Sequence, residues 1–302
     1  MRFALTALTD ELRRLKTAGV KTVAVSDASI AALRETMASR AQPAVGPELK
    51  AVPPLPVAGV KPVLPTKPVT AKPSPVPTLP APPTLTLPDG GKQIRWDALL
   101  ALVQNDPVCR AHVRPGKKVV LGVGHLDAKI MFVGEAPGAE EEVQGEPFVG
   151  PAGQLLTKMI QGMGLKRSDV YIGNIMNWRP ELPTSANGEQ YGNRPPTEEE
   201  MCYCLPYLRA QIEVVAPALL VALGTTAAQG LLGFGSFKAL GDIRGRWAEF
   251  AGKPLMVTYH PSYILRNQSN RSKRMIWEDL LKVMELGALP ISDRQRGFFL
   301  DK

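Results

Sequence analysis

Cysteine is scarce in this chain, with three residues among 302, and their odd number and spacing do not form a disulfide framework. A long apolar run is also missing, because no stretch of about 18 apolar residues is present that could cross a bilayer. Near the first residue, Asp10 and Glu11 come too early for the apolar core of a signal peptide. We therefore expect a protein of the reducing cytoplasm that has no contact with a membrane.

Acidic residues are too few to balance the basic ones, and the excess gives a formal net charge of +8 and a pI near 9.4. Lysine and arginine that neutralise phosphates release condensed counterions, so this balance favours a polyanionic partner such as a nucleic acid. The charge alone fits a generically basic globular protein equally well. A nucleic-acid partner is therefore a hypothesis that needs a matching site.

Proline divides the chain into segments of different character. Fifteen of the 29 prolines fall between residues 41 and 88, where they alternate with Val, Ala, Leu and Thr. This composition predicts an extended linker, with a docking peptide as the alternative. We expect a monomer of four segments: a short helical N-terminal segment at 1–40 that offers a contact to a protein partner, a proline-rich linker at 41–92, a folded domain at 93–288 and a loose charged tail at 289–302.

Within residues 93–288, short apolar runs alternate with stretches of helical spacing that open with capping residues, such as Thr197 with Glu200. This alternation predicts a three-layer α/β/α fold with a central parallel sheet. The predicted strands are Lys118–Val123, Lys129–Val133, Val170–Ile175, Ala218–Leu223 and Leu255–Tyr259. The predicted helices are Gly153–Met163, Thr197–Val215, Thr225–Leu232 and Arg271–Glu285.

Two polar motifs directly follow predicted strands. Gly134–Gly138, with an acidic continuation to Glu142, comes after one strand, and His260–Arg266 comes after another. Ligands of open parallel sheets bind outside the carboxyl ends of the strands, so we expect the two motifs to meet in one crevice. Phe148 adds an aromatic ring in a glycine-containing loop beside the acids. The sequence therefore predicts one site with a carboxylate, an imidazole and an aromatic face.

Each of these features also has a purely structural interpretation. Clustered acids are found in solvated turns, and a lone histidine such as His260 is more often structural than catalytic. The cations and amides from Arg266 to Arg274 suit the binding of a phosphate backbone, but they are also typical of a solvated helix start. Taken together, the features describe a site that receives a base extruded from a nucleic acid.

Five motifs occur in one order along the chain: Glu135–Gly138, Phe148–Leu156, Val170–Asn174, Asn193–Pro195 and His260–Arg266. In these motifs the chain resembles the family 4 uracil-DNA glycosylases over roughly residues 97–286. The resemblance implies an enzyme, a hydrolase of DNA repair that removes uracil from DNA and leaves an abasic site for base excision repair. Its partner would be DNA that contains uracil.

The resemblance gives a role to each residue that would contact uracil. The base would lie against Gly134, stack on Phe148 and present its edge to Asn174, whose amide has both a donor and an acceptor. An Asn at a strand end is otherwise a turn former. His260 would donate a hydrogen bond to the uracil oxygen as negative charge develops there.

The resemblance leaves the activation of water less defined. Glu135 and Glu141 match acidic positions of the family, and one of them, with Asn193 nearby, would hold or polarise the attacking water. The sequence leaves open which glutamate does so. In family 1 glycosylases the turn contains a water-activating Asp, and Ala136 stands at the corresponding place here.

The second motif and the helix after it would contact DNA. The apolar triplet Tyr263–Leu265 would provide a wedge that fills the gap left by the extruded base, although such a triplet is also ordinary core. Ser262 and Arg266 would bind phosphates. The predicted DNA contacts are Ser262, Leu265, Arg266, Arg271 and Lys273.

Family 4 enzymes typically hold a four-iron four-sulfur cluster through four cysteines. Here Cys109 and Cys204 match two of those positions, whereas Asp106 and Trp178 stand at the other two. Two thiolates do not make the usual site, and a set completed by the third cysteine and a nearby histidine would be unusual. We therefore expect no cofactor, with Trp178 filling the vacated volume by packing.

Two other functions remain open from the sequence. A non-hydrolytic member of the superfamily would bind damaged DNA in a tight, salt-sensitive complex, and a polymerase-associated accessory module would bind free nucleotides but not DNA. An insertion at residues 181–192 lengthens the loop near the site, so the substrate preference could differ from that of the family. Uracil and hypoxanthine are not distinguished, nor are single- and double-stranded DNA.

Overall fold

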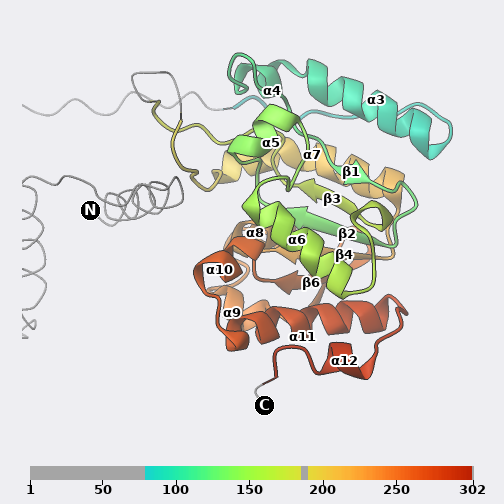
Figure 1. Ribbon diagram of the computed structural model, residues 1–302. Coiled ribbons are helices and arrows are strands. Elements are labelled where there is room, and N and C mark those ends of the chain that lie inside the picture. Colours follow the sequence, from blue (N-terminus) through green and yellow to red (C-terminus); the bar gives the residue numbers. More distant parts are fainter. Residues whose placement is uncertain (1–78, 185–189, 301–302) are drawn as a thin grey trace, which may run out of the picture. The chain divides into compact units, whose positions relative to one another are not determined.

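The computed structural model describes residues 79–184 and 190–300 (Figure 1). The predictions of a helical segment at 1–40 and of a linker over 41–78 lie outside these residues. Both strand-end motifs lie within them. In the described ranges, no helix combines the length and the apolar character that a membrane span needs.

A six-stranded sheet forms the centre of the domain. Its strands are β1 Val123–Gly124, β2 Ile130–Gly134, β3 Tyr171–Asn174, β4 Leu219–Leu223, β5 Trp247–Phe250 and β6 Lys253–Thr258. They are arranged in the order β1-β3-β2-β4-β6-β5, with parallel pairing among the four inner strands and antiparallel pairing at both edges. The predicted parallel sheet is confirmed for the inner strands. The edges differ, because β5 was not predicted and β1 is only the end of a longer predicted run.

Helices cover both faces of the sheet (Figure 1). The face formed by Met131 and Val133 packs against α3 Lys92–Asn105, α4 Pro107–Ala111, α7 Glu198–Val215 and α8 Thr225–Leu232. The face formed by Ile130 and Phe132 packs against α6 Pro151–Gly162, α10 Pro261–Arg266 and α11 Asn270–Leu286. Two further helices are short. The first, α5 Ala139–Gln144, follows β2, and the second, α9 Leu240–Ile243, precedes β5. The three-layer α/β/α architecture is as predicted.

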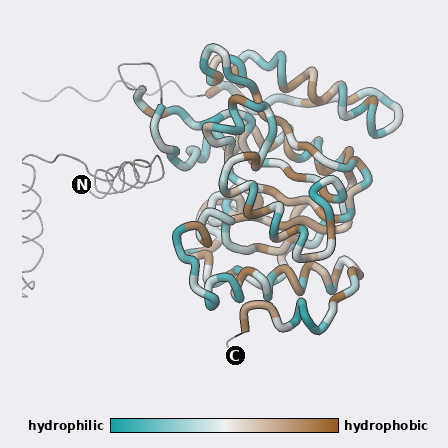
Figure 2. Tube along the Cα trace, viewed as in Figure 1, coloured by the Kyte–Doolittle hydropathy of each residue, from teal (hydrophilic) through white to brown (hydrophobic). Residues whose placement is uncertain are grey.

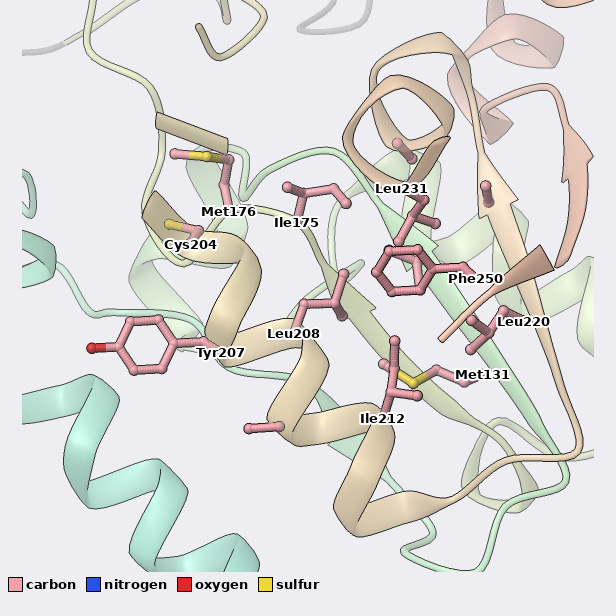
Figure 3. Close-up of a cluster of buried hydrophobic side chains, with 14 of the residues drawn as sticks. Met131, Ile175, Met176, Cys204, Tyr207, Leu208, Ile212, Leu220, Leu231 and Phe250 are labelled. Atoms are coloured by element: carbon pink, nitrogen blue, oxygen red, sulfur yellow. The ribbon is translucent and has the colours of Figure 1, made fainter. Parts of the chain in front are cut away.

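The core beneath α7 shows why these strands and helices associate. Leu208 and Ile212 of α7 lie over Met131 of β2 and Leu220 of β4 (Figure 3), and all four side chains are almost fully buried. Apolar residues gather along the strands and the inward faces of the helices (Figure 2). Burial of a large aliphatic side chain contributes roughly 1.5–3 kcal/mol, so these contacts between α7 and the sheet stabilise the packing of the two layers.

Both ends of the domain differ from the prediction. Leu79, Leu85 and Leu87 pack against the core beneath α7, so the packed domain begins before the predicted residue 93. Residues 289–300 are also packed rather than loose, and they include a short helix, α12 Asp293–Arg296. The Trp277 indole donates to the Gln295 carbonyl at 2.6 Å. The prediction of a loose tail is therefore wrong for residues 289–300, because their polar composition conceals a few apolar anchors.

Candidate active site

A cavity of about 650 Å³ lies at the carboxyl ends of the parallel strands. The ends of β2 and β3 and the segments after β4 and β6 form its walls, so the structure places the two strand-end motifs in one cavity. The predicted site residues that line it are Glu135, Glu141, Phe148, Asn174, Asn193, His260, Ser262 and Arg266. The remaining ones, Gly134, Leu265, Arg271 and Lys273, lie outside this lining.

Asn174 reaches the cavity because the residue beside it has no side chain. A Cβ at Gly134 would lie 2.4 Å from Asn174 Oδ1 and 2.5 Å from the Phe148 ring, which is closer than such atoms approach. Gly134 therefore lets the amide and the ring meet. Asn174 is only 5% exposed, and its Nδ2 has no hydrogen-bond partner among residues 79–184 and 190–300. A buried donor without a partner costs about 1–3 kcal/mol, so a ligand that brings an acceptor is expected here.

Phe148 is held in a strained backbone conformation at one wall. Its φ is 55°, in the left-handed region that residues other than glycine rarely adopt. A Cβ at Gly153 would lie 1.8 Å from the Phe148 carbonyl oxygen, so only glycine allows α6 to pack this closely. Arg167 donates to the preceding Pro147 carbonyl at 2.6 Å. The ring of Phe148 is thus presented to the cavity by a loop that is fixed on several sides.

Glu141 provides another of these restraints. Its carboxylate accepts hydrogen bonds from the backbone N–H groups of Gly138 at 3.0 Å and of Val149 and Gly150 at 2.9 Å each. These bonds join the turn after β2 to the loop that carries Phe148. The Glu141 carboxylate is therefore held by three backbone amides, one in the turn after β2 and two next to Phe148.

Glu135 is the other acidic residue in the lining of the cavity. It is partly buried at the end of β2, and burial raises the pKa of its carboxyl group, while a hydrogen bond from Thr226 acts in the opposite direction. Thr226, on the first turn of α8, was not predicted as a site residue. It lies three residues after the end of β4, and a polar residue close behind an inner strand is a signal that could have identified it.

The ring of His260 is fixed through one nitrogen. Nδ1 accepts a hydrogen bond from the Ser262 backbone N–H at 3.2 Å and lies 2.9 Å from the Ser262 hydroxyl oxygen. A ring nitrogen that accepts from an amide carries no proton, so the proton of the neutral ring is on Nε2. Burial, together with the charge of Arg266, lowers the pKa of His260 to about 4, and Glu141 offsets this only partly. At neutral pH the ring is therefore an uncharged donor.

A buried ion pair supports the strand end that carries His260. Asp279 of α11 accepts from Thr258 Oγ1 at 2.7 Å and from Arg244 Nη2 at 2.8 Å. The Arg244 guanidinium also lies 5.5 Å from the centre of the Tyr259 ring, which stacks on Tyr263. These residues hold the segment between β6 and α10 in place.

The structure reduces the predicted apolar wedge to one side chain. Ile264 is buried in the core beneath α11, and Tyr263 is stacked on Tyr259, whereas Leu265 is 42% exposed. Of the three, Leu265 is the one free to enter a DNA duplex. Lys273 lies near the C-terminal segment, with its Nζ 6.0 Å from the centre of the Phe299 ring.

The positions of the family's cluster ligands contain a hydrogen-bonded core. The Asp106 carboxylate accepts from the hydroxyls of Tyr203 and Tyr207 at 2.9 Å each and from the Cys109 backbone N–H at 2.7 Å. The hydrogen bond with Cys204 and burial both raise the pKa of the Cys109 thiol. In the part of the chain that the structure describes, no three His, Cys, Asp or Glu side chains are grouped to hold a metal.

Trp178 occupies the interior of the same region. Its side chain is fully buried, stacks on His112 at a centroid distance of 4.9 Å and lies 6.2 Å from the Tyr203 ring. The Trp178 side chain thus fills this volume by packing, and its Nε1 has no hydrogen-bond partner among the residues that the structure describes. The residues present do not fit a four-iron four-sulfur cluster.

Comparison with known proteins gives the family. The sequence pattern of the Uracil DNA glycosylase superfamily matches residues 121–281. A type-4 uracil-DNA glycosylase of Thermotoga maritima is 41% identical over 181 residues, which are 60% of this chain and 88% of that protein. Type-4 uracil-DNA glycosylases of Pyrobaculum aerophilum and Saccharolobus solfataricus are each 39% identical, over 57% and 58% of this chain and 85% and 80% of their own lengths. Because the matched region spans more than half of the chain and contains the walls of the cavity, this chain belongs to the uracil-DNA glycosylase superfamily.

Proposed function

We propose that this protein is a uracil-DNA glycosylase that hydrolyses the N-glycosidic bond of uracil in DNA and leaves an abasic site for base excision repair. The observation that carries the proposal is the Nδ2 donor of Asn174, which is buried beside Phe148 in the cavity and has no partner in the described part of the chain. Uracil presents a carbonyl oxygen to such a donor, whereas cytosine presents an amino group at the same position. The relatives named type-4 uracil-DNA glycosylase support the same substrate.

Binding of the extruded base would use three groups. Phe148 stacks on the ring and replaces the lost base stacking. Asn174 pairs with the pyrimidine edge, with Nδ2 donating to the uracil oxygen. His260 donates from Nε2 to the other uracil oxygen, where negative charge develops as the glycosidic bond breaks. This hydrogen bond strengthens as the uracil anion forms, because the accepting oxygen gains negative charge.

Hydrolysis would then proceed at the sugar. The bond between the sugar carbon and the uracil nitrogen breaks, a bond from that carbon to water forms, and uracil leaves as an anion that takes its proton from solvent. Glu135 accepts a proton from the attacking water, and its negative charge stabilises the cationic sugar. Asn193, on the rim of the same cavity, helps to hold the water.

DNA would approach across the mouth of the cavity. Arg266, Ser262, Arg271 and Lys273 would contact phosphates, and Leu265 would enter the gap that the extruded base leaves. Uracil-containing DNA is thus the partner of the domain. We also propose that the enzyme acts as a monomer in the cytoplasm and that residues 1–40 contact a protein partner.

Strand breakage tests the function directly. We expect a labelled oligonucleotide with one uracil to break at that site after treatment with the protein and then alkali. A control oligonucleotide with thymine at the same place should remain intact. A gel shift without breakage would favour the non-hydrolytic binder, and binding of free nucleotides but not of DNA would favour the accessory module; either result would reject the glycosylase.

We further propose that the enzyme works without an iron-sulfur cluster. This rests on the Asp106 carboxylate, which is engaged by two tyrosine hydroxyls, and on the packed Trp178 side chain. Protein purified without oxygen is expected to contain no stoichiometric iron or sulfide, and a chelator should leave its rate of uracil release unchanged. About four irons per chain, or a loss of activity on chelation, would contradict the proposal.

A further inference from the structure

Arg179 is a buried cation that links the active site to the inserted loop. Its side chain is 5% exposed, and its Nη1 pairs with the Glu142 carboxylate at 2.9 Å. Nε donates to Asn193 Oδ1 at 2.8 Å, and Nη2 donates to the Gly192 carbonyl at 2.7 Å. The guanidinium therefore joins α5, the end of the insertion and a residue that lines the cavity.

These contacts fix the orientation of the Asn193 amide. A guanidinium has donors and no acceptor, so the atom of Asn193 that faces Arg179 has to be the oxygen. The amide N–H₂ group is then the part left for the cavity. It lies on the side of Gly138, where a Cβ would be 3.8 Å from Asn193 Nδ2. Asn193 thus offers a donor to the site, and its acceptor is already used.

The same cation holds the base of the insertion at 181–192. Gln190 is buried, and its side-chain amide donates to the Pro180 carbonyl at 2.9 Å and accepts from the Leu182 N–H at 3.1 Å. The backbone carbonyl oxygen of Gln190 lies 3.4 Å from Arg179 Nη2. The two described ends of the insertion are therefore joined to each other and to Arg179.

We propose that Arg179 is a positioning residue for uracil excision, because it turns the Asn193 amide so that the N–H₂ group donates into the cavity. The inference rests on the proposed function. Arg179 contacts both the base of the inserted loop and Asn193. A change at the base of the loop should therefore alter the position of the Asn193 N–H₂ group, which donates to the substrate and water.

A double-mutant cycle separates positioning from general support of the fold. Arg179→Lys keeps the charge but loses the planar fork, and we expect kcat to fall about tenfold with KM within about twofold. In the Asn193→Ala background, Arg179→Lys should cause no further loss, because Arg179 acts through that amide. An equal loss in both backgrounds would overturn the proposal.

Arg114→Lys is the matched control, because Arg114 also pairs with Glu142 but has no contact with Asn193 in the described structure. We expect it to change kcat by less than about twofold. Asn193→Asp gives a second test if Arg179→Lys does not fold. It keeps the pairing with Arg179 but replaces the donor with an acceptor, so it should lose as much activity as Asn193→Ala. Full activity of Asn193→Asp would overturn the proposal.

A spectroscopic measurement is independent of turnover. The side-chain amide protons of Asn193, assigned in ¹⁵N-labelled protein by comparison with Asn193→Ala, should shift in Arg179→Lys and stay unchanged in Arg114→Lys. Unshifted signals in Arg179→Lys would show that the guanidinium does not orient the amide. An inactive wild type would reject the proposed function, whereas the amide signals would still decide the role of Arg179.

Discussion

Replacement of His260 by alanine is expected to lower kcat by about 10²–10³, with a much smaller effect on KM. The reason is that Nε2 of the neutral ring donates to a uracil oxygen whose negative charge grows as the bond breaks. Ser262 holds the other nitrogen, so the donor is oriented before the substrate binds. Single-turnover rates of uracil release from a labelled oligonucleotide measure the effect.

The pH dependence separates a neutral from a charged His260. Its pKa is lowered to about 4, so the ring is neutral above that pH and takes up a proton only below it. Titration of His260 should therefore not affect the rate between pH 5 and 8. In this range the rates of the wild type and of His260→Ala should depend on pH in the same way. A wild-type rate that falls as the pH rises through about 6.5, with this fall absent in the variant, would show that the imidazolium is the active form.

The same pKa predicts a loss of stability in acid. The unfolded chain binds a proton to this histidine near pH 6.5, whereas the folded chain does so only near 4. Between these values the unfolded state holds more protons, so the free energy of unfolding falls as the pH decreases from 6.5 to 4. The loss is on the order of 3 kcal/mol and should be smaller in His260→Ala, as chemical denaturation at several pH values would show.

Replacement of Glu135 by glutamine is expected to have the second large effect, a loss of roughly 10² in kcat. The carboxylate accepts a proton from water and faces the cationic sugar, and a neutral amide does neither. Burial raises the pKa of Glu135 above its usual value, so the wild-type rate should fall as the pH decreases through that raised pKa. The acid limb should be absent from the pH profile of the variant.

Thr226→Val provides the matched control for Glu135. The Thr226 hydrogen bond lowers the pKa of Glu135, so its loss should move the acid limb to higher pH and leave the maximal rate nearly unchanged. An acid limb that persists in Glu135→Gln, or that does not move in Thr226→Val, would assign the titration to another group.

The inner strands of the sheet could be predicted from the sequence, and so could the convergence of the two strand-end motifs on one cavity. β2 and β4 are continuous apolar runs, buried at every position, and such runs are typical of parallel strands covered on both faces. β5 escaped prediction because it is an edge strand, with Trp247 39% exposed and a charged Glu249 between apolar residues. Its pairing with β6 depends on a contact that its own composition does not indicate.

The roles within the acidic motif depend on hydrogen bonds that spacing does not reveal. Glu135 and Glu141 cannot be distinguished by residue type. In the folded chain, three backbone amides donate to the Glu141 carboxylate, whereas Glu135 is hydrogen-bonded to a threonine. Arg179 lies between Trp178 and the insertion, and no pattern in the sequence indicates its role. Its importance arises because the chain returns to it from the far side of the insertion, so that its donors reach Asn193 and Gly192.

Release of free uracil by the full-length chain, followed by mass spectrometry under single-turnover conditions with a chelator present, is the most direct test of this account. We expect one free uracil for each abasic site formed. We also expect no free cytosine from a matched oligonucleotide, because the donor of Asn174 would then face the amino group of cytosine. Intact uracil-containing DNA recovered from a stable complex with the protein would contradict the proposed function.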